Sequence, residues 1–279
     1  MRFLLSILLL LISAPTAAES LSLKGKLTQG GLVVGHTEPG TVVTFEGRKI
    51  RVSPKGNFVI GFSRDAPPTA KLVLRHPDGA IRTKTLQVKK RKYRIQRIDG
   101  LPPKMVTPPK KVLARIRREN AMIGRARKPD TPVPYFMKGW IWPAKGRISG
   151  VYGSQRILNG KPRRPHFGVD VAAPVGTPIV APSDGVVRLV EPDLYYTGGT
   201  VIIDHGHGVS SAFLHMQDVT ATLGKTVRQG EKIGTLGATG RATGPHLDWR
   251  INYFRARIDP ALLVPPMPKP AKARKRRKR

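Results

Sequence analysis

Cysteine is absent from the 279 residues of this chain. Without thiols, the protein has no disulfide bonds, no cysteine nucleophile and no zinc site held by cysteine. A zinc site in this protein would therefore need histidine or carboxylate ligands.

Long apolar runs are also scarce, and the clearest one lies at the start of the chain. Arg2 precedes a largely apolar stretch from Phe3 to Ile12, which the small residues Thr16-Ala17-Ala18 follow. This order is typical of a secretory signal peptide, residues 1–18, cleaved after Ala18; the alternative is an uncleaved anchor. We expect an exported protein, in the periplasm or cell envelope, with no transmembrane span in the mature chain.

Acidic residues are few: 17 Asp and Glu stand against 50 Lys and Arg, which gives a formal net charge of +33. Such an excess implies a polyanionic partner or surface. Because export disfavours nucleic acid, the candidates are anionic wall polymers, lipid head groups and the carboxylates of peptidoglycan. Eight of the eleven residues 269–279 are Lys or Arg. Residues 265–279 are predicted to be a disordered basic tail that binds anionic envelope polymers.

Glycine and proline, by contrast, are frequent, with 29 and 26 residues. They indicate many turns and short strands. Residues 19–100 contain short β-branched and apolar runs bounded by turn residues, at 32–35, 41–45, 58–60, 71–74 and 81–88. This regular spacing predicts a small immunoglobulin-like β-sandwich.

Proline clusters separate this region from the rest of the chain. Residues 101–134 are predicted to be a Pro-rich linker that contains a helix between 110 and 127. Residues 135–264 are again rich in predicted strands and hold most of the motifs. The predicted fold is therefore mainly β, with a linker helix between two β domains.

Two segments of the second domain place histidines where chemistry is expected. His166 and Asp170 lie in an extended segment, and four strand residues span roughly 13 Å. Two ligands of one metal must lie closer together, so the chain must bend, and Gly168 permits this. His215 is predicted on the returning strand of a hairpin whose turn is residues 205–208.

A third segment begins at His246. Alternation puts His246, Asp248 and Arg250 on one face of a strand and turns Leu247 and Trp249 into the core. Three histidine or aspartate ligands plus a water make a hydrolytic zinc centre. Histidines that do not bind the metal can act as general bases or bind an oxyanion. Each residue alone is a weak signal, because a lone strand histidine is more often structural.

The combination resembles the lysostaphin-like, or LytM-type, zinc endopeptidases. The pattern of that family is His-x-x-x-Asp, then a His near the end of a strand, then His-x-His. His166 and Asp170 match the first element, His215 the second, and His246 the first half of the third. The framework between these motifs agrees as well, over roughly residues 140 to 262.

The resemblance implies a curled, mostly antiparallel β-sheet of the duplicated hybrid motif type, with one Zn²⁺ per chain. In the family the first His, the Asp and the last His hold the metal, but this chain has Asp248 at the last position. The expected ligands are then His166, Asp170 and Asp248, and the expected catalytic residues are His215 and His246. A second carboxylate would make the bound water less acidic. Alternatively, Asp248 only pairs with an arginine on its own strand.

The function implied by this resemblance is hydrolysis of peptide bonds in peptidoglycan stems or cross-bridges. The alternative is a degenerate, non-catalytic module of the same fold that binds the wall or activates an amidase. Four basic residues precede the first histidine and are expected in a loop beside the groove, where they meet stem carboxylates or solvent: Arg156, Lys161, Arg163 and Arg164.

Overall fold

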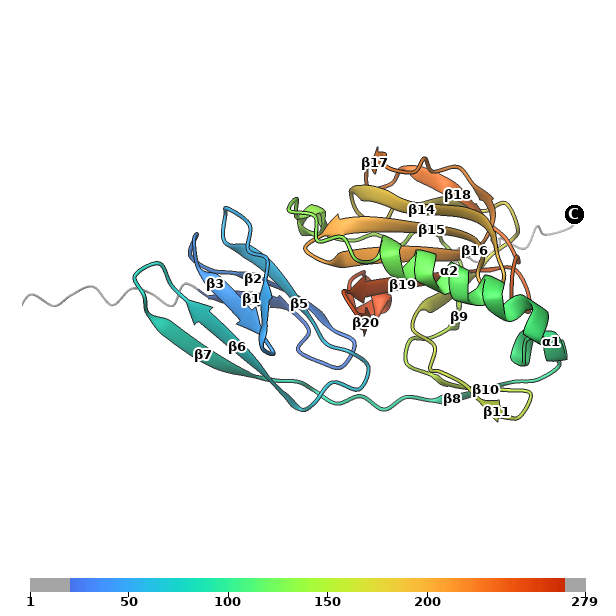
Figure 1. Ribbon diagram of the computed structural model, residues 1–279, viewed down its shortest axis with the longest axis horizontal. Helices are drawn as coiled ribbons and strands as arrows, with labels where there is room; N and C mark the ends of the chain where they lie inside the picture. Colours follow the sequence, from blue (N-terminus) through green and yellow to red (C-terminus); the bar gives the residue numbers. More distant parts are fainter. Residues whose placement is uncertain (1–20, 269–279) are drawn as a thin grey trace, which may run out of the picture.

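The computed structural model describes residues 21–268. The predicted signal peptide and residues 269–279 of the predicted tail lie outside this range. Within it the chain forms a small β region, a helical connection and a larger β region, so the expected mainly β fold is confirmed (Figure 1). No helix between residues 21 and 268 is long and apolar enough to cross a membrane.

The N-terminal region consists of two antiparallel sheets, ordered β1-β2-β5 and β4-β3-β6-β7. The strands are β1 (Ser22–Gly25), β2 (Leu32–His36), β3 (Val42–Phe45), β4 (Arg48–Ile50), β5 (Asn57–Gly61), β6 (Thr69–Arg75) and β7 (Ile81–Gln87). Alternate residues of β6, Ala70, Leu72 and Leu74, are buried and share one apolar core with Val33 and Phe58. The five predicted strands are present, β1 and β4 have no counterpart among them, and the immunoglobulin-like topology stays a prediction.

A connection rich in proline follows. It contains β8 (Ile95–Ile98), α1 (Pro103–Val106), the 3-10 helix η1 (Lys110–Val112), α2 (Leu113–Ala126) and the 3-10 helix η2 (Tyr135–Lys138). η1 and α2 together confirm the helix predicted between residues 110 and 127. α2 does more than connect, because Met122, Ile123 and Ala126 pack against apolar side chains of the larger sheet.

The larger region is an antiparallel sheet with the main order β17-β14-β15-β16-β19-β12-β9, to which β13, β18 and β20 are added. Its strands are β9 (Arg147–Gly150), β12 (Val169–Ala172), β13 (Pro178–Val180), β14 (Gly185–Leu194), β15 (Gly198–Gly206), β16 (Val209–Val219), β17 (Thr226–Val227), β18 (Lys232–Leu236), β19 (His246–Tyr253) and β20 (Ala256–Ile258). β10 (Gln155–Leu158) and β11 (Lys161–Pro162) form a separate sheet with β8, and the 3-10 helix η3 (Pro260–Leu262) follows β20. β15 and β16 form the predicted hairpin.

The two faces of the larger sheet differ in chemistry. Leu247 and Trp249 of β19 are fully buried in the core, as predicted, so Asp248 between them points to the other face. Leu214 of β16 is the direct cross-strand partner of Asp248, and such partners share a face. Leu214 belongs to the apolar cluster that packs against α2, the helix that lies across the larger sheet in Figure 1. The helix therefore lies on the same face as Asp248.

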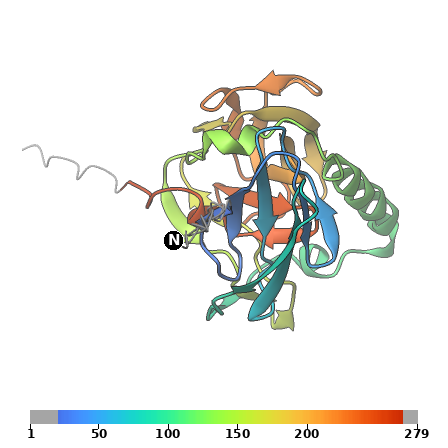
Figure 2. The same ribbon diagram turned by 90° about the vertical axis from the view of Figure 1, so that its left-hand side faces the viewer.

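The N-terminal region is docked against the larger sheet, in front of it in the view of Figure 2. Leu32 and Val59 belong to the same core cluster as Ile258 of β20. An added Cβ on Gly61 would lie only 2.9 Å from the Ile258 side chain, so glycine is needed for this close contact. The N-terminal region and the larger sheet therefore share part of one core.

Candidate metal centre

Two aspartates face each other across β12 and β19. Asp170 is the direct cross-strand partner of Asp248, and both are buried, with 6% and 1% of their surface exposed. The Cβ atoms of such partners lie about 4.5–5.5 Å apart, and like charges there are destabilising. A buried pair of carboxylates in this arrangement needs cations close to it.

His166 approaches this pair from the segment that precedes β12. The chain bends at Gly168, as predicted. Space requires a glycine there as well, because an added Cβ would lie 2.3 Å from Asp248 Oδ1. Gly150 of β9 makes room for the other carboxylate, since an added Cβ would lie 2.1 Å from Asp170 Oδ2. The two glycines thus form a cradle around the two carboxylates.

The three side chains converge. One potential ligand atom from each of His166, Asp170 and Asp248 lies within 4.8 Å of the other two. His166 Nε2 and Asp170 Oδ1 are 3.0 Å apart, yet both are buried and neither has a hydrogen-bond partner within residues 21–268. Buried polar atoms without partners are rare and call for an explanation such as an ion. Imidazole and two carboxylates match the ligand types and number of an open zinc site, so these residues fit a zinc ion.

Each aspartate also has an arginine partner. Arg156 of β10 donates a hydrogen bond to Asp170 Oδ2 at 3.0 Å. Arg250 of β19 donates from Nε and Nη2 to the two oxygens of Asp248, at 3.0 and 2.6 Å. Burial alone would raise the pKa of Asp248, but Arg250, aided by His166, holds this pKa below its usual range. The ion pair expected as an alternative to metal binding is therefore present, but it leaves two of the four lone-pair directions of the carboxylate free.

His215 reaches the same face through an irregularity in β16. Strict alternation from the buried Phe213 would turn His215 into the core, yet Met216 is the next core residue. The pairing with β15 shifts at this point, from Val201↔Phe213 to Gly199↔Met216, which makes a β-bulge. His215 has a φ of 65°, in the left-handed region that residues other than glycine rarely adopt. Such strained residues are concentrated at functional sites.

The imidazoles of His215 and His246 are both held through Nδ1. His215 Nδ1 donates to Thr239 O, and His246 Nδ1 donates to Gly244 O, each at 2.8 Å. The two ring centroids are 4.8 Å apart, and His246 Nε2 lies 4.0 Å from Asp170 Oδ1. Burial lowers the pKa of His215 to about 4, so its ring is neutral at neutral pH and carries a lone pair on Nε2.

The structure brings together all five residues that the sequence analysis selects. Arg156, expected in a loop beside the groove, lies on β10 and pairs with Asp170. Thr239 is missing from the sequence analysis because its role is that of a backbone carbonyl, which any residue supplies. Gly150 is missing because its only signal is the absence of a side chain.

Comparison with known proteins places these features in a family. The family model described as Peptidase family M23 matches residues 164–260, a range that holds all five site residues. The curated relatives include the peptidoglycan DD-endopeptidases ShyA and ShyC of Vibrio cholerae serotype O1, 36% identical over 130 residues and 47% identical over 107 residues. These alignments cover 44% and 37% of this chain but 30% and 24% of the relatives, so the chain spans less than a third of their length.

A solved structure gives the more extensive match. A crystal structure described as an M23 peptidase from Pseudomonas aeruginosa is 30% identical in sequence and superimposes with a TM-score of 0.66. The match covers 85% of this chain and 95% of that chain, so it includes the N-terminal region as well as the larger sheet. On this similarity over nearly the whole of both chains, the chain belongs to peptidase family M23, the LytM-type peptidases.

Proposed function

We propose that this protein is a zinc-dependent endopeptidase that hydrolyses peptide bonds in the stems or cross-bridges of peptidoglycan. The observation that carries the proposal is the convergence of His166, Asp170 and Asp248 around buried atoms that lack hydrogen-bond partners within the described residues. Two imidazoles with fixed orientation lie beside this cluster. Family membership adds support, since M23 peptidases are zinc-dependent.

One zinc ion per chain would be held by His166, Asp170 and Asp248. Zinc at such a site supplies a Lewis acid for a carbonyl oxygen and acidifies water. A second carboxylate would by itself weaken this effect. Arg250 offsets the loss, because the Asp248–Arg250 ion pair is neutral as a unit, like the histidine that the family has at this position. Arg156 withdraws charge from Asp170 in the same way.

His215 and His246 would carry out proton transfer. Each Nδ1 is committed to a backbone carbonyl, so each ring offers Nε2 for chemistry. A neutral imidazole accepts a proton from water at Nε2, and the resulting imidazolium donates a proton to the leaving amine. The low pKa of His215 keeps it in the proton-accepting form, and its left-handed backbone fixes the direction of the ring.

Peptidoglycan as the substrate is supported by relatives and by charge. ShyA and ShyC are named peptidoglycan DD-endopeptidases. Several arginines lie close together near the centre. Burial, and then the positive charges of Arg250 and Arg164, lower the pKa of Arg257 to about 10. A cationic surrounding attracts the carboxylates of peptide stems. The predicted signal peptide supports action in the periplasm or envelope, and the predicted basic tail would add attraction to anionic envelope polymers.

One observation favours a second candidate function, a non-catalytic module that binds the wall or activates an amidase. Arg250 engages both oxygens of Asp248, and a buried bidentate pair of this kind can close a former metal site without any ion. In that case the histidines would keep their places as structural residues. Zinc content and hydrolysis separate the two functions.

The test uses the full mature chain, purified peptidoglycan and defined free zinc. We expect one zinc per chain at micromolar free metal, and soluble fragments with new amino termini. Chelation should stop their release and zinc should restore it. His215→Ala serves as the control, because it should keep the metal and lose the release of fragments. Binding of peptidoglycan without zinc and without fragments would support the non-catalytic module instead.

A further inference from the structure

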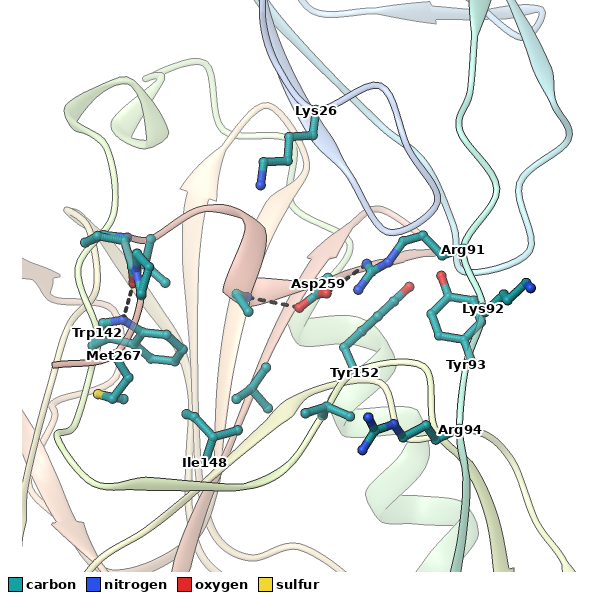
Figure 3. A pocket seen from close by; sticks show the side chains of 16 residues that line it. Lys26, Arg91, Lys92, Tyr93, Arg94, Trp142, Ile148, Tyr152, Asp259 and Met267 are labelled. Carbon is teal, nitrogen blue, oxygen red and sulfur yellow. Dashed lines mark hydrogen bonds and ion pairs between the residues drawn. The ribbon is translucent and has the colours of Figure 1, made fainter. Parts of the chain in front are cut away.

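A cavity of about 630 Å³ lies where the N-terminal region meets the larger sheet (Figure 3). Its walls come from three parts of the chain: Lys26 with residues 91–94, residues 142–152 with Val169, and residues 259–267. The volume is within the range of about 300–1,000 Å³ typical of small-ligand sites.

This cavity is separate from the candidate metal centre. Val169 of β12 lines the cavity, whereas the next residue, Asp170, belongs to the metal cluster. Successive residues of a strand point to opposite faces of a sheet. The cavity and the candidate centre therefore lie on opposite faces of β12, and a ligand in one does not touch the other.

Several polar groups of the cavity wall are bonded to other groups of the protein, so the cavity is already formed. Tyr152 donates its hydroxyl hydrogen bond to Arg257 O at 2.6 Å, and Trp142 Nε1 donates to Pro265 O at 2.8 Å. The Asp259 carboxylate pairs with Arg91 at 2.8 Å. A ligand would not have to break these contacts in order to bind.

The charge of the cavity is unbalanced. Four basic side chains line it, and its only carboxylate, that of Asp259, is already paired with Arg91. Within residues 21–268, Lys26 and Arg94 form no ion pair. In Figure 3 they reach toward the cavity from opposite sides, while Lys92 points away. Apolar side chains form the wall between them, among them Trp142, Ile148 and Met267.

We propose that this cavity is a second, non-catalytic binding site for a carboxylate-bearing peptide stem of peptidoglycan. Two carboxylates would pair with Lys26 and Arg94, and the short apolar side chains of the stem would lie on the wall of Trp142, Ile148 and Met267. Cations on opposite sides of an apolar wall favour a ligand with separated charges over a lipid phosphate, whose charge is concentrated in one group. The choice of this ligand rests on the proposed function. The cavity would hold one peptidoglycan strand by its peptide stem while the metal centre acts on a neighbouring stem.

The test measures the binding of soluble disaccharide-peptide fragments to the full mature chain, depleted of metal, by isothermal titration calorimetry. Lys26→Glu/Arg94→Glu reverses the two unpaired charges. Lys49→Glu/Arg82→Glu makes the same change in net charge at exposed sites of the N-terminal region, outside the cavity lining, and is the matched control. Because Lys26 and Arg94 have no ion-pair partners to lose, the variants should fold.

We expect the cavity variant to bind the fragments about tenfold or more weakly than the control variant, since losing even one hydrogen bond to a charged group is enough for about a tenfold loss of affinity. Hydrolysis of a short soluble peptide should be unchanged. Equal affinities of the two variants would overturn the inference. So would preferential binding of phosphatidylglycerol vesicles that is lost in the cavity variant, since the ligand would then be a phosphate. A further outcome is that the metal-loaded chain shows no hydrolysis at all while the fragments still bind through Lys26 and Arg94. In that outcome the proposed reaction fails and this inference stands.

Discussion

The β15–β16 hairpin has a buried histidine near each of its ends. His205 lies near the turn and is fully buried, and His215 lies near the open end and is 6% exposed. Burial lowers the pKa of both imidazoles to about 4, because it disfavours the charged form. By burial and pKa alone the two residues cannot be told apart.

Their contacts separate them. His205 uses both ring nitrogens, with Nδ1 at 2.6 Å from Asp184 O and Nε2 at 2.7 Å from Ser211 Oγ. His215 uses only Nδ1 in the described structure, and its backbone is in the left-handed region. A catalytic role is therefore expected for a buried histidine that has one ring nitrogen without a hydrogen bond and a left-handed backbone. A shifted pKa by itself indicates only burial.

The largest effect should come from removing charge from the proposed metal site. Asp170→Asn keeps the shape of the side chain but replaces an anionic ligand with a neutral amide. We expect zinc to fall from one per chain to background, and release of peptidoglycan fragments to stop. Zinc stoichiometry by atomic spectroscopy and fragment release on purified peptidoglycan measure the two effects.

The turn end of the hairpin offers a matched control for this change. Asp204 is also buried and paired with an arginine, Arg188, at 3.2 Å. Asp204→Asn should lower stability and leave the zinc content unchanged. If both variants lost zinc equally, the metal would depend on the general stability of the sheet, and the proposed site would be wrong.

The next effect compares the two histidines directly. His215→Ala should keep the metal and lower the turnover rate about 10²–10⁴-fold, the usual contribution of a general acid or base. His205→Ala should keep turnover in the folded fraction and lower the free energy of unfolding by about 2–4 kcal/mol, because it leaves Ser211 Oγ and Asp184 O without their partner. Steady-state kinetics and urea unfolding of both variants test this. A loss of turnover for folded His205→Ala would break the distinction.

Much of the fold follows from local pattern. Alternation identifies Leu247 and Trp249 as core residues, and the N-terminal runs coincide with strands because turn residues bound them. The helix between residues 110 and 127 is also predicted. Its position on the same face of the sheet as Asp248 is not, because a helix's apolar residues tell that it packs but not against which surface.

For the candidate site, too, local sequence pattern does not give the long-range contacts. Motif spacing selects its five residues, but the direct pairing of Asp170 with Asp248 depends on strand register, which the sequence does not state. Alternation even points His215 the wrong way, since only the β-bulge, with both Phe213 and Met216 in the core, turns it to the site face. Long-range pairing and irregular backbone thus account for what the sequence analysis misses.

A smaller effect concerns pH and the turn end of the hairpin. The pKa of His205 is about 4 in the folded state against 6.5 in the unfolded chain, so between these values the unfolded state binds more protons. Stability therefore falls as the pH drops from 6.5 to 4, by on the order of 3 kcal/mol for this group. In metal-depleted protein, His205→Gln should lose less stability than wild type between pH 7.5 and 4.5. Equal losses for wild type and His205→Gln would contradict the assignment.

The smallest effect is expected when Asp248 is exchanged for the histidine of the family. Asp248 combines features of the other two aspartates. It has an arginine partner like Asp204, and it lies beside His166 like Asp170. Asp248→His restores the ligand of the family but leaves Arg250 buried without its partner, which is costly. Arg250→Gln added to it removes that charge. The double variant should bind zinc at least as tightly as wild type, by up to about tenfold. Positions 248 and 250 together keep a net charge of zero, and no guanidinium competes with the metal for the ligand at position 248.

A second double variant, Asp248→Ala/Arg250→Gln, removes the proposed ligand and the arginine together. It should lose zinc, while Asp204→Ala/Arg188→Gln, which removes the equivalent pair at the turn end, should keep it. Zinc affinities from competition with a chelator dye decide between these outcomes without any measurement of activity. If Asp248→Ala/Arg250→Gln retains full zinc affinity, Asp248 acts only as the partner of Arg250. The metal would then have two protein ligands, His166 and Asp170, and Asp248 would belong with Asp204 among the structural residues.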